Sequence, residues 1–485
     1  MRTITHSADL DLIRAVAAGQ HVAIAGDLLD RVARTRQQAL EVLRQDQAVY
    51  GVNTGMGKLS SVRLTEQEQS THQRNLLLAR AVGGPPYLTR AEARAVLVTR
   101  LLTFLNGDAA VSPGLCEQLA GDLNSGETPE IPRDGMGAAG EITHLAHAFA
   151  PLATRYQLGP KEGVALIQGV PGTTALATLR LAETAELTAV MTQAAALSIA
   201  AIRASRDPYQ HAVARGDDIQ AGLLRRLRDL AGDEPEPRSL QAPVSFRVAG
   251  PVLANIVRAS DALQEAVKRA LTGVTDSPAF LGGHFTGTAG FHGIDLSAHC
   301  DQLTAAITHA AEVSAARLHR LMDPAVTGLN AQLARNPGPE AGLSPVHKRA
   351  AGEVHAMRRL ATATATGLIE TSAGQEDVQS FSWEATEKLR QAIGHAQVVT
   401  ACELLAAFQA AALAGTEPPR WLTAVIPPIT ADRPFGEDLT RILSRCFLLP
   451  LDGGGGLAGH VHYDAVDFRY LVGDAGRDAG DHRFR

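Results

Sequence analysis

One stretch near the middle of the chain restricts the fold strongly, because it is apolar on every side. Between Glu186 and Arg203 every residue is apolar or small, with four exceptions: Thr188, Thr192, Gln193 and Ser198. A helix that is apolar all round must be covered by other elements. The stretch is too short and too polar for a comfortable membrane span. It therefore predicts a helix inside a helical protein, and no membrane partner.

Further long runs with helical spacing, all rich in Ala and Leu, lie at 252–272, 298–322, 346–370 and 382–414. Alanine-rich faces let helices approach closely, so the sequence predicts a mainly α fold: a long helical bundle with a smaller N-terminal region that carries Gly-rich loops. We expect the N-terminal region at 1–172, the central bundle at 173–415, and a helical and irregular C-terminal region at 416–485 with a frayed tail. Association between subunits is also expected.

Charge and cysteine content narrow the partners and the compartment. The chain has 45 Lys and Arg residues against 51 Asp and Glu residues, without blocks of one sign, which argues against nucleic acid as a partner. Its four cysteines are far apart and form no CxxC pair, so neither a disulfide framework nor a zinc site is expected. Residues 1–20 lack an apolar signal core. These features predict a cytoplasmic protein.

A Gly-rich and Ala-rich stretch at 134–147 is the first candidate for a site. Five of the residues in 134–140 are Gly or Ala, and a helical pattern follows from Glu141. Such a backbone turns tightly and lets neighbouring groups approach, and a helix N-terminus favours negative charge nearby. Taken alone, the stretch is more simply explained as a Gly-rich turn that only packs against its neighbours.

A second Gly-rich segment, 50–59, begins with Tyr50. It is not a phosphate loop, because Gly51 is one residue too far from Gly57-Lys58 and Leu59 replaces the Ser or Thr that would bind magnesium. The segment instead presents a phenol on a flexible loop. A tyrosine with a depressed pKa can act as a general base, although a lone tyrosine is also a common core residue.

Other irregular segments carry charged side chains. A helix predicted over 72–83 places Arg80 near its C-terminus, where it can also serve only as a helix-end charge. Arg247 ends a segment with Gln241 in which one guanidinium can clamp a carboxylate. Glu376 and Asp377 follow a Gly in another break of the helical pattern. The scattered histidines match no metal-ligand signature, so no metal is expected.

Three of these segments, together with a turn at 161–166, resemble the aromatic amino acid ammonia-lyases and aminomutases, the histidine and phenylalanine ammonia-lyase superfamily. The resemblance extends from about Val49 to Ala414, and its motifs are the tyrosine loop 50–55, the helix 72–77, the turn 161–166 and the acidic loop 374–377. It implies a lyase with the histidine ammonia-lyase-like helical fold. It also implies a homotetramer whose active sites draw residues from more than one subunit.

The same resemblance implies that the stretch at 134–147 is the position at which the family forms its prosthetic group. In the family this stretch contains Ala-Ser-Gly, which cyclises and loses two waters to form the electrophile methylidene-imidazolone. Here the triplet is Ala138-Ala139-Gly140, and alanine has no hydroxyl to lose. The prosthetic group is therefore not expected to form, and no cofactor is expected.

The resemblance also assigns roles residue by residue. Tyr50 and Glu376 match the catalytic positions, and Arg80 occupies the position that helps select the substrate side chain. Substrate-binding positions are retained at Gln241, Arg247 and Phe285 and altered at Gln168 and Val244. Family asparagines are further replaced by His284 and Gly374.

Three functions follow as hypotheses. The first is an enzyme that works without methylidene-imidazolone, by acid–base chemistry on a carboxylate-bearing small molecule derived from an amino acid, in an elimination, isomerisation, cyclisation or hydrolysis. The second is a conventional aromatic amino acid ammonia-lyase or aminomutase whose serine has been replaced by Ala139. The third is a non-catalytic binding protein on the same fold.

Overall fold

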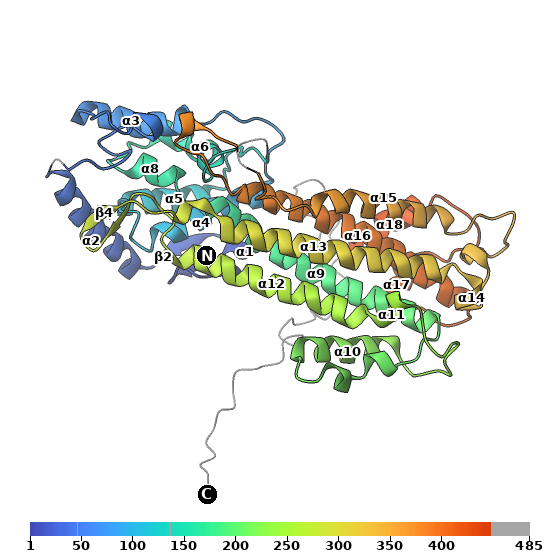
Figure 1. Ribbon diagram of the computed structural model, residues 1–485. Helices are drawn as coiled ribbons and strands as arrows, with labels where there is room; N and C mark the ends of the chain where they lie inside the picture. The colour runs from blue at the N-terminus through green and yellow to red at the C-terminus, as the bar shows by residue number, and fades with distance from the viewer. Residues whose placement is uncertain (46, 135–136, 368, 448–485) are drawn as a thin grey trace, which may run out of the picture.

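A computed structural model describes residues 1–45, 47–134, 137–367 and 369–447. Five long helices form the body of the molecule (Figure 1): α9 Pro171–Ala201, α12 Ala249–Thr272, α13 Ile294–Leu321, α15 Ser344–Leu360 and α16 Ser382–Leu413. Helix α9 packs against α12, α13 and α16, while α15 packs on α13 and α16. The mainly α bundle predicted from the sequence is confirmed.

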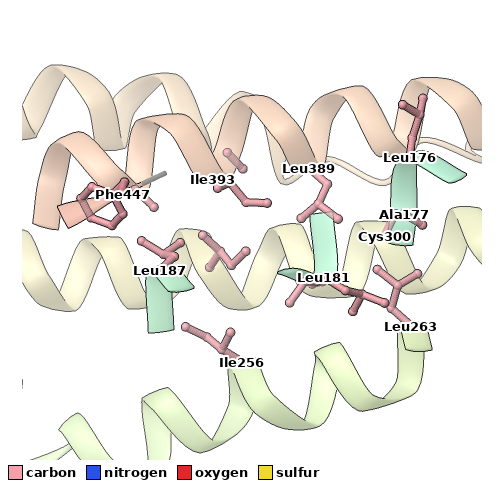
Figure 2. Packing of buried hydrophobic residues seen from close by; sticks show 14 of the residues in the cluster. Leu176, Ala177, Leu181, Leu187, Ile256, Leu263, Cys300, Leu389, Ile393 and Phe447 are labelled. Carbon is pink, nitrogen blue, oxygen red and sulfur yellow. The ribbon is translucent and has the colours of Figure 1, made fainter. Parts of the chain in front are cut away.

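Packing inside the bundle follows from the apolar stretches of the sequence. Leu181 and Leu187 of α9 point toward α12 and α16, where Ile256, Leu263, Leu389 and Ile393 meet them (Figure 2). Burying one such side chain contributes about 1.5–3 kcal/mol. Among the described residues, α16 alone is long and apolar enough to pass a test for a membrane span, and 72% of its most apolar window is buried inside the protein. Burial in the bundle accounts for that apolarity.

The N-terminal part of the chain folds into shorter elements at one end of the bundle (Figure 1), which we call the head. Its helices are α1 Leu10–Ala17, α2 Gly26–Leu43, α3 Glu66–Leu78, α4 Arg90–Phe104, α5 Pro113–Ser125, α6 Ile142–Phe149, α7 Leu152–Arg155 and α8 Glu162–Ile167. Strands β1 Arg2–Ile4 and β2 Val22–Ile24 pair in parallel, and β3 Ala279–Leu281 pairs antiparallel with β4 His284–Thr286. The helices α3 and α4 both begin with a capping box, at Thr65 and Thr89.

The opposite end of the bundle, which we call the far end, holds α11 Val244–Arg247, α14 Pro324–Thr327 and α17 Arg420–Thr423 (Figure 1). Helix α10 Asp218–Ala231 packs on α9 and α12, and α18 Phe435–Cys446 packs on α16.

Two predicted helix boundaries are wrong. The run at 346–370 is helical only to Leu360, because the following segment is held by tertiary contacts: Asp301 accepts hydrogen bonds from the N–H and hydroxyl of Thr364, both at 2.6 Å. The helix predicted over 72–83 spans Glu66–Leu78, since the capping box at Thr65 starts it earlier. Part of the predicted 416–485 region, including the tail, lies outside the described residues.

Candidate functional site

Tyr50 lies in a tight turn of the head and its side chain is partly exposed. The phenol oxygen accepts a hydrogen bond from the Gly57 N–H at 2.7 Å, which holds the ring against its own loop. The next residue, Gly51, has φ +66°, and a Cβ there would lie 2.8 Å from Met56 Cγ. Only glycine therefore suits the turn that presents Tyr50.

Arg80 follows α3 and donates to the Leu76 carbonyl at 3.4 Å. Burial lowers the pKa of Arg80, and its interactions with the Tyr50 phenol and the Glu376 carboxylate oppose that shift. Tyr50 and Glu376 thus each lie within electrostatic reach of Arg80 in a single chain.

Glu376 is held by several hydrogen bonds at the end of a strained loop. Its Oε1 accepts from Ser372 Oγ at 2.9 Å, and its Oε2 accepts from the Ala139 N–H at 3.2 Å. The backbone of Ser372, Ala373 and Gly374 has φ of +53°, +53° and +84°. Two consecutive non-glycine residues in the left-handed region cost free energy, and such strain is typical of functional loops.

The turn at Ala138–Gly140 therefore faces Glu376 through a backbone N–H. A Cβ on Gly140 would lie 3.1 Å from the Phe291 carbonyl oxygen and 3.6 Å from that of Gly169, so the turn is wedged between two other loops. The segment 50–59, which contains the tyrosine loop, joins the same assembly, since Gly57–Leu59 contacts Ser372–Gly374. Tyr50, Arg80, Glu376 and the Ala138–Gly140 turn are thus brought together within one chain.

Gln168 caps the C-terminus of α8, next to this turn, and is buried. Its carbonyl oxygen accepts a hydrogen bond from the guanidinium of Arg100. Burial lowers the pKa of Arg100 to about 10, while the carboxylates of Asp276 and Glu141 oppose the shift. Asp276 is itself paired with Lys161 at 3.0 Å, and that lysine is fully buried. A network of buried charges thus supports the backbone behind the site.

Glu141 belongs to this network and was not identified from the sequence as a site residue. Its carboxylate accepts the N–H groups of Gly172 and Thr173, both at 2.7 Å, at the N-terminus of α9. Burial nevertheless raises the pKa of Glu141 to about 7. The sequence offers no signal for the network, because Lys161 and Asp276 are separated by 115 residues.

His72 is a second residue that the sequence did not single out. Burial lowers its pKa, and the charge of Arg80 lowers it further. Its Nε2 is buried and has no hydrogen-bond partner among the described residues. The imidazole is therefore a neutral group near Arg80.

Gln241, Val244 and Arg247 lie at the far end of the bundle, away from Tyr50 (Figure 1 shows α11 at the end opposite α3 and α6). Gln241 and Val244 are exposed. Arg247 donates to the Ala242 carbonyl at 2.9 Å. One copy of the chain therefore does not bring Arg247, the predicted carboxylate clamp, close to the predicted catalytic residues Tyr50 and Glu376.

Buried side chains hold the backbone of helix α11 in place. Arg317 donates to the Ser245 carbonyl at 3.3 Å and forms an ion pair with Glu403 at 2.6 Å, in which both side chains are buried. Tyr209 donates its hydroxyl to the Phe246 carbonyl at 2.9 Å. The short helix that carries Arg247 therefore has a rigid support.

Phe285 is on β4, where its ring meets Phe280 edge to face at 5.2 Å. The two rings pack with Ala39, Val42 and Ala110. Among the residues that the structure describes, no contact joins Phe285 to Tyr50. The role of Phe285 in binding substrate stays a prediction.

Comparisons with known proteins agree with this architecture. The family profile described as aromatic amino acid lyase matches residues 8–427. The histidine ammonia-lyase of Symbiobacterium thermophilum is 30% identical, over 91% of this chain and 96% of that protein. The crystal structure of the ergothioneine-degrading enzyme ergothionase from Treponema denticola superposes with a TM-score of 0.86 and 23% identity, over 92% of this chain and 98% of the other. Tyrosine aminomutase from Streptomyces globisporus gives a TM-score of 0.82 and 23% identity, over 91% and 95%.

Proposed function

Because this chain belongs to the aromatic amino acid lyase family and is a lyase-type enzyme, we propose that it acts by acid–base chemistry without methylidene-imidazolone. The substrate class is a carboxylate-bearing small molecule derived from an amino acid. The observation that carries the proposal is that Arg80 interacts electrostatically with both Tyr50 and Glu376, and that the Glu376 carboxylate accepts the backbone N–H of Ala139.

The residues at 138–140 do not fit the family's prosthetic group. The turn supplies the backbone that would cyclise, but the methyl side chain of Ala139 has no hydroxyl that could leave to create the reactive alkene. The proposed reaction therefore draws on the side chains around the turn and on the substrate itself.

Those side chains suit a substrate with a more acidic proton, or a better leaving group, than an ordinary amino acid. In an elimination, Tyr50 as phenolate takes the β-proton, the C–H electron pair forms the C=C bond, and the C–N bond breaks with its electron pair leaving on the amine. Arg80 meets an anionic or polar group of the substrate. Where the amino group leaves from its neutral form, Glu376 gives it a proton, so that it departs as neutral ammonia. Isomerisation, cyclisation and hydrolysis use the same groups.

The carboxylate of the substrate is assigned to Arg247 of a second copy, because one chain holds Arg247 at the far end. A homotetramer that places α11 of one subunit beside the head of another completes the site. This arrangement is a proposal, supported by the separation of the two groups within one chain.

Activity is best sought in a panel of amino acids and their N-trimethyl betaines. The name of the Treponema neighbour makes ergothioneine a member of that panel. A trimethylammonium group is permanently cationic and leaves as a neutral amine, so it needs less assistance than ammonia.

With a substrate in hand, Tyr50→Phe and Glu376→Gln should each lower kcat by about 10²–10⁴-fold, the range for losing a general base or acid. Tyr156→Phe is a matched control, since that phenol lies 3.3 Å from Ser112 Oγ, outside the site. Retention of turnover in both Tyr50→Phe and Glu376→Gln would contradict the proposal.

A conventional lyase whose serine has been replaced is the second candidate, favoured by the 30% identity to a histidine ammonia-lyase. It requires that Ala139→Ser restore the prosthetic group, with new near-ultraviolet absorbance and the loss of two waters from the intact mass. An unmodified Ala139→Ser protein that releases no ammonia from aromatic amino acids excludes this candidate.

A further inference from the structure

Gln73 lies on α3 with its side chain fully buried, and both ends of its amide are hydrogen-bonded to backbone of other segments. Its Nε2 donates to the Gly51 carbonyl at 3.0 Å. Its Oε1 accepts from the Val164 N–H at 3.1 Å. One side chain therefore links the tyrosine loop, α3 and α8.

The first of these bonds acts next to Tyr50. Gly51 follows Tyr50 directly, and its N–H donates to Thr54 Oγ1 at 3.2 Å while its carbonyl is taken by Gln73. On the other side of Tyr50, the Val49 N–H donates to Asn53 Oδ1 at 2.7 Å. Within this set, Gln73 supplies the tie to another element, because Asn53 and Thr54 belong to the loop itself.

The second bond depends on a close approach of two helices. A Cβ on Gly163 would lie 2.2 Å from the Gln73 carbonyl oxygen, so α8 can reach α3 only because residue 163 is glycine. That approach brings the Val164 N–H within reach of the amide. Helix α8 ends at the Gln168 turn, and α3 leads to Arg80.

We infer that Gln73 is a positioning residue that fixes Tyr50 relative to Arg80 and the Gln168 turn. The inference rests on the proposed role of Tyr50 in proton transfer. Gln73 touches no reacting atom and acts through the backbone on the C-terminal side of Tyr50. An amide suits this task because it donates and accepts at once, whereas a carboxylate only accepts.

Gln73→Glu keeps the shape of the side chain and the acceptor for Val164, and while its carboxyl is ionised it turns the donor toward Gly51 into an acceptor. Gln73→Met, which fills a similar volume without either bond, is the second variant. Gln409→Glu is the matched control: Gln409 is also buried, and its Nε2 donates to the Leu333 carbonyl at 3.1 Å on the far side of the bundle.

Amide hydrogen exchange of the folded proteins tests the positioning without any substrate. In peptides that cover 49–57, the amide hydrogens of Gln73→Glu and Gln73→Met should exchange at least about tenfold faster than those of the parent. Local opening of the loop then no longer has to break the hydrogen bond between Gln73 and the Gly51 carbonyl. Gln409→Glu should leave these peptides unchanged. Parent-like exchange at 49–57 in both Gln73 variants would overturn the inference whether or not Tyr50 is the base.

A kinetic measurement tests the consequence for the reaction once a substrate is found. Gln73→Glu should lower kcat by about 100-fold with a smaller change in KM, as expected for a displacement of a reacting group by about 1 Å. In a Tyr50→Phe background the same change should have little further effect, since its target is already gone. If the two losses multiply fully, Gln73 has only a structural role. If Tyr50→Phe is fully active, the proposed function has failed instead.

Discussion

At the head, Tyr50 and Glu376 are held by loops whose ties are hydrogen bonds among amides, hydroxyls and backbone groups, whereas Arg247 at the far end is on a short helix above a buried ion pair. The Glu403 carboxylate is fully buried and accepts from Arg317, Ser198 and Ser314. The Glu376 carboxylate is only half-buried and is bound by a strained loop. The difference separates two kinds of support: one that fixes a proposed proton-transfer group locally, and one that is part of the global stability of the bundle.

The largest expected difference between the two ends is in unfolding free energy, when one carboxylate is removed from each end. Glu403→Leu leaves the buried guanidinium of Arg317 without its partner, which should cost about 3–5 kcal/mol of unfolding free energy. Glu376→Gln should change the unfolding free energy by less than about 1 kcal/mol, because the group is near the surface and keeps an acceptor oxygen. Guanidinium titrations of both variants measure the two values. Similar losses for the two variants would show that the ends are not supported differently.

The second expected effect is a dependence of the unfolding free energy on pH, which comes from the buried carboxyl groups behind the head. The folded-state pKa of Glu141 is raised to about 7 from 4.5, so the stability it contributes is present below about pH 4.5 and is lost as the pH rises through about 7. The full loss is about 3 kcal/mol. Asp108, whose pKa burial raises to about 6, adds a loss in an overlapping window.

Urea titrations between pH 4.5 and pH 8 measure this dependence. Glu141→Gln should flatten the fall in unfolding free energy, leaving the part that belongs to Asp108. A variant with the same slope as the parent would show that Glu141 does not titrate in this range.

The smallest expected effect is the recovery of activity when the head of one subunit and the far end of another together form a site. Tyr50→Phe and Arg247→Met chains should each be nearly inactive, and co-expression should raise activity at least about tenfold above either variant, because some mixed sites then hold both native groups. Activity that stays at the level of the single variants would show that Arg247 of a second copy does not complete the site of Tyr50. Light scattering of the parent protein checks the tetramer itself.

The sequence allowed the bundle to be predicted because long apolar runs leave little choice other than buried helices, as at α9 and α16. Roles for Tyr50 and Glu376 could be predicted because both residues lie in short motifs that resemble those of the family. The end of α15 could not be placed, since Asp301 ends it from another helix. The bonds of Gln73 and the surroundings of Glu141 were also out of reach, because they depend on segments that only the fold brings together. Likewise, the sequence could not show that Arg247 lies far from Tyr50 within one chain.

The central claim is that the chain works with an unmodified Ala138-Ala139-Gly140 turn. The intact mass of the purified, active protein tests it directly, because cyclisation of the backbone removes water. We predict the mass of the unmodified sequence, 51.1 kDa, with turnover that depends on Tyr50. A mass lower by one or two water molecules, located by peptide mapping to the 138–140 turn, would contradict the account.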